Sequence, residues 1–502
     1  MRRADRSLLI GLDVGSTAVK AALVRFDGSI EHVARRPTPY RSLAGGSGAH
    51  DPDALLGAAE AVVAECAAAA AQRPVAGLGI ASMAEAGVPL GRGGRPLGEI
   101  IPWFDPRSAS DAEALAREVG PEALFAATGL RAEAKSTLAK LRWLGRHRPA
   151  TIRRATAWAG VAELVGLAFG GGLATNASLA CRTLAFDVRA GAWDAGLLGL
   201  AGFDPERMPR VVPLGWPVGG LLAPVARRLG LRAGLPVAIA GHDHLVGALG
   251  AGVARPGQAL DSLGSAEACL LVTAEPLLRD ELRREGFSVG RHPLDGRSYV
   301  LGGLQASGAL VEWFVDAFLP GPAAPDERYA RFLATVGAAR STPTGLVVLP
   351  YLRGRTAPAP DREARLVVAG LGPADGLPDV ALALLEGTAF AARWLLEALE
   401  RTAGTRLGTV RLIGGGTRNP AWLRTKTAVS TWPSELVEAD EAVCLGAALV
   451  GGIAGGVFAS PAAALRSAAP IRRLPRDRAA AGRYEEVYRR RFLPAVAAAT
   501  TG

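Results

Sequence analysis

The sequence predicts an α/β protein with mixed sheets, built as two similar halves. Short apolar runs with strand character alternate with Ala-rich helical stretches in both halves, and 49% of the residues are hydrophobic. A pattern of strand, Gly-Ser turn and strand at residues 7–26 recurs at residues 258–272. In 502 residues this repeat favours two domains, 1–252 and 253–502, with the boundary in the stretch 250–257.

The first half begins with the predicted hairpin, whose turn covers Asp13–Thr17. A helix should follow over residues 53–71, because Asp51 suits its N-cap and Pro52 its first turn. The remaining patterns predict strands at 75–80 and 236–240, an interruption at 241–244, and helices at about 110–118, 137–147, 158–169 and 245–249.

The second half repeats the hairpin with its turn at Gly264-Ser265. A strand from residue 410 runs into Gly414–Gly416, and Asn419-Pro420 then suits the start of a helix. The Pro/Gly-rich segments 317–325 and 353–362 should be loops, and residues 484–496 an amphipathic helix.

The net charge of +10 and the pI of about 10.0 would by themselves suggest a nucleic acid or an acidic membrane as partner. Residues 466–491, however, hold nine arginines against three acidic residues, which concentrates most of the excess in one terminal segment. The rest of the chain is nearly balanced, and no run of 18 apolar residues occurs. We therefore expect no nucleic-acid partner and no membrane span.

The four cysteines are far apart and form no C-x-x-C pair. A disulfide framework is not expected, and a reducing cytoplasm fits this usage best. Each should be a small buried apolar residue. They are Cys66, Cys181, Cys269 and Cys444.

The first hairpin turn carries residues suited to phosphate. Gly15 lets the backbone approach closely, Ser16 and Thr17 add hydroxyl donors, and Lys20 supplies a cation. Asp13 could hold a metal ion carried in with a nucleotide. An ordinary hairpin would also contain such a turn, but the second turn at 264–265 favours two turns that clamp a phosphate chain. No G-x-x-x-x-G-K-[ST] segment is present, which excludes a P-loop.

Gly414–Gly416 remove side chains where a flat group could lie against the backbone, although a tight strand–helix connection explains them equally well. Gly241-His242-Asp243-His244 follows a buried strand, at the sheet edge where ligands bind in open α/β sheets. Asp243 there could be a general base, part of a metal site with the two histidines, or simply a helix cap.

Glu85 and the pair Trp103 and Asp105 each follow a strand-like run. A carboxylate beside an indole suits a polyol, with hydrogen bonds for hydroxyl groups and an apolar face for C–H groups. The alternative is that these residues belong to turns or the surface.

In this order and spacing, the segments resemble the FGGY carbohydrate kinases, a family that includes glycerol kinase, xylulokinase and fuculokinase. The resemblance covers nearly the whole chain and extends to residues 140–144, 175–183, 349–354 and 441–448. It implies two actin-like/hexokinase-like (ribonuclease H-like) domains with the active site in the cleft between them.

The resemblance also implies ATP-dependent phosphorylation of a hydroxyl group on a small sugar or polyol. Asp243 would accept the hydroxyl proton, and Asp13 would position Mg²⁺, together with Asp243. The ATP phosphates would contact Gly15, Ser16, Thr17, Lys20, Gly264 and Ser265. The rest of the nucleotide would contact Gly308, Glu312, Gly415, Gly416 and Asn419. The sugar would contact Glu85, Trp103, Asp105, Asp243 and Lys135. A homodimer is compatible with the family.

Departures from the family limit the prediction of the substrate. Met83-Ala84-Glu85 stands where xylulokinases usually carry Met-His-Gly and glycerol kinases an Arg-Glu pair, so neither D-xylulose nor glycerol follows. Lys135 matches a substrate-facing position only roughly, and a solvated lysine is the alternative. A catalytically silent relative that binds nucleotide and acts as a switch on a partner, an acid kinase, and a nucleic-acid-binding protein are the competing functions.

Overall fold

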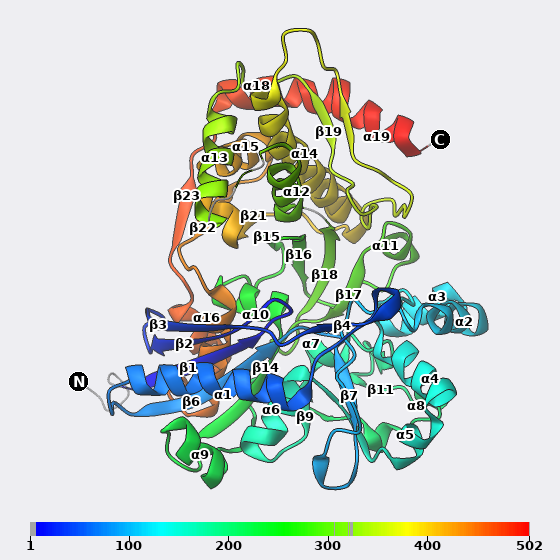
Figure 1. Ribbon diagram of the computed structural model, residues 1–502, viewed down its shortest axis with the longest axis vertical. Coiled ribbons are helices and arrows are strands. Elements are labelled where there is room, and N and C mark those ends of the chain that lie inside the picture. Colours follow the sequence, from blue (N-terminus) through cyan, green and yellow to red (C-terminus); the bar gives the residue numbers. More distant parts are fainter. Residues whose placement is uncertain (1–6, 306, 320, 322–324, 501–502) are drawn as a thin grey trace.

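The computed structural model describes residues 7–305, 307–319, 321 and 325–500. It contains two large mixed sheets, one from each half of the chain (Figure 1). The first has the order β13-β14-β6-β1-β2-β3 and the second the order β17-β18-β16-β15-β21-β22-β23. Both have parallel pairs at the centre and antiparallel strands toward the edges.

The strands of the first sheet are β1 (Leu8–Val14), β2 (Ala18–Arg25), β3 (Ile30–Pro37), β6 (Val75–Ser82), β13 (Pro217–Gly220) and β14 (Pro236–His242). Those of the second are β15 (Gln258–Leu263), β16 (Glu267–Thr273), β17 (Ser288–Arg291), β18 (Ser298–Leu304), β21 (Thr409–Ile413), β22 (Ser434–Val437) and β23 (Ile471–Leu474). Leaving out β17, the order from β3 to β13 and the order from β18 to β23 repeat the same sequence of antiparallel and parallel pairs. The predicted internal repeat is therefore present in the strand topology.

The first sheet lies between two layers of helices. Alternate residues of β1, from Leu8 to Val14, join a core with α1 (Pro52–Ala69), α6 (Val161–Gly170) and α9 (Ala223–Leu229). Leu9 points the other way, into a core with α10 (Asp243–Gly250) and α16 (Ala442–Ala454). This alternation follows from the two-residue period of a strand.

Helix α16 comes from the second half of the chain but packs on the first sheet. A Cβ atom at Gly11 would lie 1.8 Å from the carbonyl oxygen of Cys444, and one at Gly79 would lie 1.9 Å from that of Ala447. Only glycine permits this approach. The core around α10 and α16 also takes in Leu260 of the second sheet, so these two helices join both halves.

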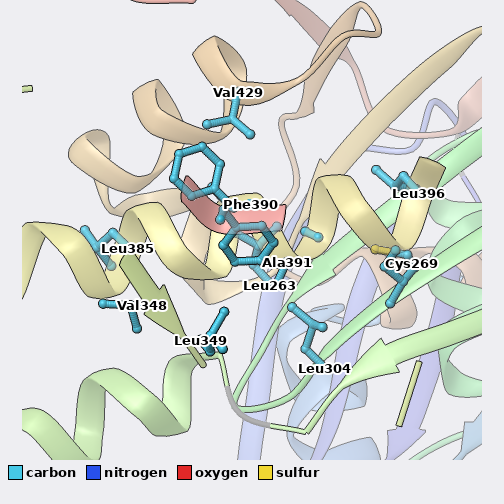
Figure 2. Close-up of a cluster of buried hydrophobic side chains, with 14 of the residues drawn as sticks. Leu263, Cys269, Leu304, Val348, Leu349, Leu385, Phe390, Ala391, Leu396 and Val429 are labelled. Atoms are coloured by element: carbon cyan, nitrogen blue, oxygen red, sulfur yellow. The ribbon is translucent and has the colours of Figure 1, made fainter. Parts of the chain in front are cut away.

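The outer face of the second sheet is covered by α14 (Leu377–Ala403), α15 (Pro420–Val429) and the C-terminal helices. Phe390 of α14 lies at the centre of this core (Figure 2). The C-terminal segment is helical from Arg478 to Thr500, as α18 (Arg478–Val487), a π-helical turn (Tyr488–Phe492) and α19 (Leu493–Thr500), so it is longer than predicted.

The other helices are α2 (Ala109–Val119), α3 (Pro121–Thr128), α4 (Thr137–His147), α5 (Pro149–Arg154), α7 (Ala177–Ala180), α8 (Ala195–Gly199), α11 (Asp280–Arg284), α12 (Gly308–Phe318), α13 (Pro325–Gly337) and α17 (Pro461–Ala464). Short two-stranded pairs join β4 (Arg41–Ser42) to β5 (Gly48–Ala49), β7 (Gly87–Leu90) to β8 (Ala157–Gly160), β9 (Ala174–Asn176) to β12 (Arg210–Val212), β10 (Phe186–Asp187) to β11 (Ala192–Trp193), and β19 (Val347–Leu349) to β20 (Val367–Ala369). None of the described helices is both long enough and apolar enough to cross a membrane.

Most predicted elements are confirmed, including the Asp51 cap, whose carboxylate accepts from the backbone N–H of Ala54. Three predictions need correction. Residues 158–160 are extended rather than helical, because β8 pairs with β7. Asp13 belongs to β1 rather than to the turn, and β14 continues to His242, with a register shift between Ile239 and Gly241 in place of the predicted interruption.

The structure describes one of the two predicted loops completely and the other only in part. Residues 353–362 form no helix or sheet strand. In the segment 317–325, α12 ends at Phe318 and α13 begins at Pro325, while residues 320 and 322–324 lie outside the described residues.

Candidate functional site

Three predicted acidic residues lie at the carboxyl edge of the first sheet. β1, β6 and β14 are parallel neighbours, and Asp13 and Gly241 are both in register with Ala81. Asp13 is therefore near the end of β1, Glu85 follows β6, and Asp243 begins the helix after β14. This edge is where open α/β sheets bind ligands.

Asp13 is buried, and its Oδ1 atom has no hydrogen-bond partner among the described residues. Burial raises the pKa of Asp13 to about 8, and the charge of Asp243 adds to the rise. A buried carboxylate oxygen without a partner, with a second carboxylate close by, fits a divalent cation such as Mg²⁺.

Asp243 accepts a hydrogen bond from the backbone N–H of His244 at 2.6 Å, and Nε2 of His242 lies 3.1 Å from its Oδ1 atom. Burial acts to raise the pKa of Asp243, but His244 and His242 outweigh this effect and lower it to about 2. The carboxylate is therefore ionised at neutral pH. The side chain remains a quarter exposed, so a ligand can reach it.

Other residues of the first hairpin turn contact elements from elsewhere in the chain. Ser16 receives a hydrogen bond from Nε1 of Trp103 at 2.7 Å and lies 3.6 Å from the sulfur of Met83. Thr17 is exposed. Lys20 is in register with Asp13 on β2, and its ammonium group lies 2.8 Å from the carboxylate of Glu441, just before α16. The predicted phosphate ligand Lys20 is thus held by an ion pair between the halves.

Glu85 forms a buried ion pair with Arg182, which donates from Nε at 3.0 Å and from Nη2 at 2.6 Å to Oε1. Burial acts to raise the pKa of Glu85, but the charges of Arg182, Lys135 and His242 lower it below its usual value. The backbone of Glu85 adopts a φ of 61°, which is uncommon outside glycine. Nζ of Lys140 donates to its carbonyl oxygen at 2.6 Å and so supports this conformation.

Lys135 lies 2.6 Å from Glu133, and its side chain is about a third exposed. Its charge is one of those that lower the pKa of Glu85. Asp105, in contrast, is fully buried and accepts hydrogen bonds from the backbone and side chain of Arg107 and from the backbone N–H of Gly48. Both of its oxygen atoms are therefore engaged within the protein. Trp103 is 40% exposed and packs edge-to-face on Phe104.

Beside Glu85 lies a cavity of about 20 Å³, which has room for one or two water molecules. Oε2 of Glu163 is buried without a hydrogen-bond partner among the described residues. Burial raises the pKa of this carboxyl group. The cavity is lined by Met83, Ala84, Glu85, Ala86, Thr137, Trp158, Gly160, Val161, Glu163, Thr175, Leu179, Ala180, Thr183, Trp193, Met208 and Pro209.

The second sheet places the other predicted residues at its own carboxyl edge. Ser262 is in register with Ile413, so the turn at Gly264-Ser265 and the loop Gly414–Gly416 are neighbours. Asn419 caps α15 as predicted, accepting a hydrogen bond from the backbone N–H of Trp422 at 3.0 Å. Gly414 has a φ of 93° and packs on the backbone of Leu263, which explains one of the three glycines by geometry alone.

Helix α12 begins directly on the second turn. The backbone N–H of Gly308 donates to the carbonyl oxygen of Gly264 at 2.9 Å. A Cβ atom at Gly308 would lie 2.8 Å from that oxygen. Glu312 is one turn further along α12 and is exposed.

Sequence reasoning assigned no site role to Arg182, Lys140, Glu441 or Lys426, although the first three lie in segments that resemble the family. For Lys140 and Lys426 the sequence offers one signal, which is that only four of its 57 basic residues are lysines. All four lysines make ion pairs or hydrogen bonds close to predicted site residues. Because lysine and arginine are not interchangeable in such contacts, the rarity of lysine in this chain draws attention to these positions.

Comparison with known families decides the class of this protein. The N-terminal domain model of the FGGY family of carbohydrate kinases matches residues 8–250, and the C-terminal domain model of that family matches residues 261–455. The chain belongs to the FGGY family of carbohydrate kinases. It is therefore a phosphotransferase, and the predicted family and two-domain actin-like fold are confirmed.

Similar proteins with known names are xylulose and glycerol kinases. The xylulose kinase of Bacillus subtilis (strain 168) is 27% identical over 454 residues, which cover 90% of this chain and 89% of that protein. The glycerol kinase of Rhodospirillum rubrum is 31% identical over 474 residues, covering 90% and 91%. The crystal structure of xylulose kinase from Rhodospirillum rubrum matches with a TM-score of 0.85 at 28% identity, covering 96% of this chain and 97% of that one.

Proposed function

We propose that this FGGY kinase transfers the γ-phosphoryl group of ATP to a hydroxyl group of a small sugar or polyol, with Asp243 as the general base. The observation that carries this proposal is the state of Asp243 at the carboxyl edge of the first sheet. Its carboxylate lies at the same sheet edge as Asp13, accepts a hydrogen bond from the backbone N–H of His244, and is a quarter exposed, so a ligand can reach it. An ionised, oriented carboxylate suits the removal of a hydroxyl proton during phosphoryl transfer.

In the proposed reaction, Asp243 accepts the proton of the substrate hydroxyl group as its oxygen bonds to the γ-phosphorus. The bond between the γ-phosphorus and its bridging oxygen breaks, and the electron pair leaves with ADP. Asp13 and Asp243 would hold Mg²⁺, in keeping with the unpartnered Oδ1 of Asp13. When bound, the ion offsets the negative charge of the phosphates.

The other predicted residues have positioning roles in this proposal. The turns at Gly15–Thr17 and Gly264-Ser265 bind the phosphates through backbone N–H and hydroxyl groups. The remainder of ATP lies against Gly308, Glu312, Gly415, Gly416 and Asn419. Because Lys20 and Glu441 are paired, Lys20 orders the first hairpin beside Asp13 and has to leave this pair to reach a phosphate.

Glu85 and Trp103 form the substrate-binding wall, with Lys135 at its margin. Glu85 accepts hydrogen bonds from substrate hydroxyl groups, while the exposed indole of Trp103 packs against C–H groups. Asp105, engaged by Arg107 and Gly48, acts by holding the Trp103 segment in place. The relatives, a xylulose kinase and a glycerol kinase, suggest ketoses and polyols as substrates. All four cysteines are free and buried, which is in keeping with a reducing compartment.

A coupled ADP-release assay with Mg-ATP and a panel of ketoses, polyols and deoxy-sugars tests the proposal. We expect one or a few sugars to stimulate ADP release, and we expect Asp243→Ala to lower kcat by at least 100-fold, within the range known for loss of a general base. The control is Asp280→Ala, which removes a partly exposed carboxylate that pairs, among the described residues, with Arg283 and Arg284 and should leave kcat unchanged.

Sugar-dependent ADP release that survives in Asp243→Ala would overturn the assignment of the base. Binding of ATP without stimulation by any sugar in the panel would favour the silent, switch-like alternative, which the comparisons do not support. A thermal-shift screen of further metabolites then distinguishes a substrate missing from the panel from the silent alternative, because a true substrate stabilises the folded enzyme.

A further inference from the structure

A buried ion cluster, separate from the residues predicted to contact substrate, lies beneath the second phosphate turn. Nζ of Lys426, on α15, is 2.7 Å from Oδ2 of Asp261 and also donates to Oε1 of Glu267. The three side chains are at most 5% exposed. Asp261 lies on β15 and Glu267 on β16, so the two carboxylates flank the Gly264-Ser265 turn.

The same carboxylate of Glu267 also holds the start of α12. Its Oε2 atom accepts a hydrogen bond from the hydroxyl group of Ser307 at 2.7 Å. The backbone N–H of Ser307 donates to the carbonyl oxygen of Ser265 at 3.0 Å. Glu267 thereby ties α12 to the turn at the point where Gly308 contacts Gly264.

Lys426 connects this arrangement to the third nucleotide-facing segment. It lies near the C-terminal end of α15, whose N-terminus is capped by Asn419 and follows the loop Gly414–Gly416. Gly416 packs against Leu263, the last residue of β15. One ammonium group therefore touches the strands on both sides of the phosphate turn and belongs to the helix that carries the proposed adenosine-facing loop.

We infer that Lys426 is a positioning residue for ATP, which fixes the phosphate turn, the start of α12 and the Gly414–Gly416 loop relative to one another. A buried cation without partners is costly, so Lys426 can be accommodated only while both carboxylates stay in place. Asp261, Glu267 and Cys269 could form a metal site by their spacing, but the ammonium group already lies against both carboxylates. The inference rests on the proposed nucleotide-binding role of these segments.

The test compares Lys426→Met with Lys426→Arg and with Arg393→Met. Arg393 is the matched control, because it is a buried cation that contacts two carboxylates, Glu397 and Glu485, and also the carbonyl oxygen of Val429 on α15. Within the described residues it forms no hydrogen bond or ion pair with the phosphate turn or with the start of α12, so it separates the loss of a buried cation beside α15 from the loss of the Lys426 cluster. We expect Lys426→Met to raise the KM for ATP and the Kd for Mg-ADP, measured by calorimetry, at least tenfold. The KM for the sugar should stay within twofold. Lys426→Arg should recover part of the loss, and Arg393→Met should lower Tm without changing either nucleotide constant.

A folded Lys426→Met enzyme that binds Mg-ADP as tightly as the wild type would overturn the inference, as would an equal effect of Arg393→Met. If Lys426→Met does not fold, Asp261→Asn combined with Lys426→Met removes one carboxylate together with the cation and gives the same comparison. The calorimetric Kd needs no sugar substrate. Absence of kinase activity in the wild type would therefore contradict the proposed function while the inference is still tested.

Discussion

The ion pair between Arg182 and Glu85 lies at the centre of the proposed substrate wall. Ala84 stands where glycerol kinases carry an arginine next to the glutamate, yet a guanidinium group still reaches Glu85, from a residue 97 positions further along the chain. Arg182 also donates to the hydroxyl group of Ser288 at 3.0 Å, so it joins the substrate wall to β17 of the second sheet.

We predict that Arg182→Gln raises the KM for the sugar by ten- to hundredfold, in line with about 1.5–3 kcal/mol for hydrogen bonds to charged groups. The KM for ATP should change less than twofold, because the hydrogen bonds of Arg182 within the described part of the chain go to Glu85 and Ser288 and to no predicted nucleotide residue. Initial-rate kinetics with both substrates varied measure this split. Ser288→Ala, which removes the hydrogen bond from Arg182 to β17, should leave the sugar KM near the wild-type value. Equal changes in both KM values would contradict a role in the substrate wall.

Nζ of Lys140 donates to the backbone carbonyl oxygen of Glu85, and the burial of this ammonium group leads to a second prediction. Burial lowers the pKa of Lys140 to about 7, against the opposing charges of Glu85 and Asp105. Since the unfolded chain keeps this proton up to its ordinary pKa near 10.5, the unfolded state binds more protons between pH 7 and 10. The contribution of Lys140 to the free energy of unfolding should therefore increase with pH across this range. Subtracting the unfolding free energy of Lys140→Met at each pH isolates this trend, and a flat difference would contradict it.

The sequence predicted a side-chain contact only where both partners lie within a few residues of each other. Asp51 and Asn419 cap their helices because the cap and the N–H groups it serves are three residues apart. Arg182 with Glu85 and Lys426 with Asp261 join residues 97 and 165 positions apart, and a single sequence contains nothing that pairs one charge with another at such separations.

At the scale of elements, α14 and α18 enclose a carboxyl group that should make their packing depend on pH. Oε atoms of Glu386 accept hydrogen bonds from Thr344 and from the hydroxyl group of Tyr484 on α18. Burial raises the pKa of Glu386 to about 7, although these hydrogen bonds oppose the rise. The folded protein therefore keeps a proton that the unfolded chain releases near pH 4.5.

This proton stabilises the fold fully at low pH, and its contribution is lost as the pH rises to about 7. At about 1.4 kcal/mol per pKa unit, the loss is about 3 kcal/mol. Glu386→Gln keeps a neutral side chain at every pH and should lack this dependence. We predict that the difference in unfolding free energy between wild type and Glu386→Gln changes by this amount between pH 4.5 and 8. Chemical denaturation at several pH values measures it, and a constant difference would show that Glu386 is ionised in the folded protein.

The whole molecule is less divisible than its duplicated sequence suggests. The repeat at 7–26 and 258–272 correctly indicated two sheets of the same topology. It could not indicate that α16 returns to cover the first sheet, because the residues that permit this contact, Gly11 and Gly79, look like ordinary strand glycines in the sequence. The boundary at 252/253 therefore remains a prediction about the sequence, while in space the two halves share the core around α10 and α16.

A chain that ends at residue 252 should lose the cover on one face of its sheet. Leu9, Ala22 and Val24 would lose the apolar partners that α16 supplies, and an exposed apolar face of this kind promotes association. We predict that residues 1–252 expressed alone aggregate or bind a dye for exposed apolar surface, and that co-expression of residues 253–502 restores a soluble complex. Size-exclusion chromatography with both fragments measures this. A monomeric 1–252 fragment with cooperative unfolding would show instead that α1, α6 and α9 on the opposite face suffice to hold the first sheet, and that α16 serves to couple the halves rather than to complete the fold.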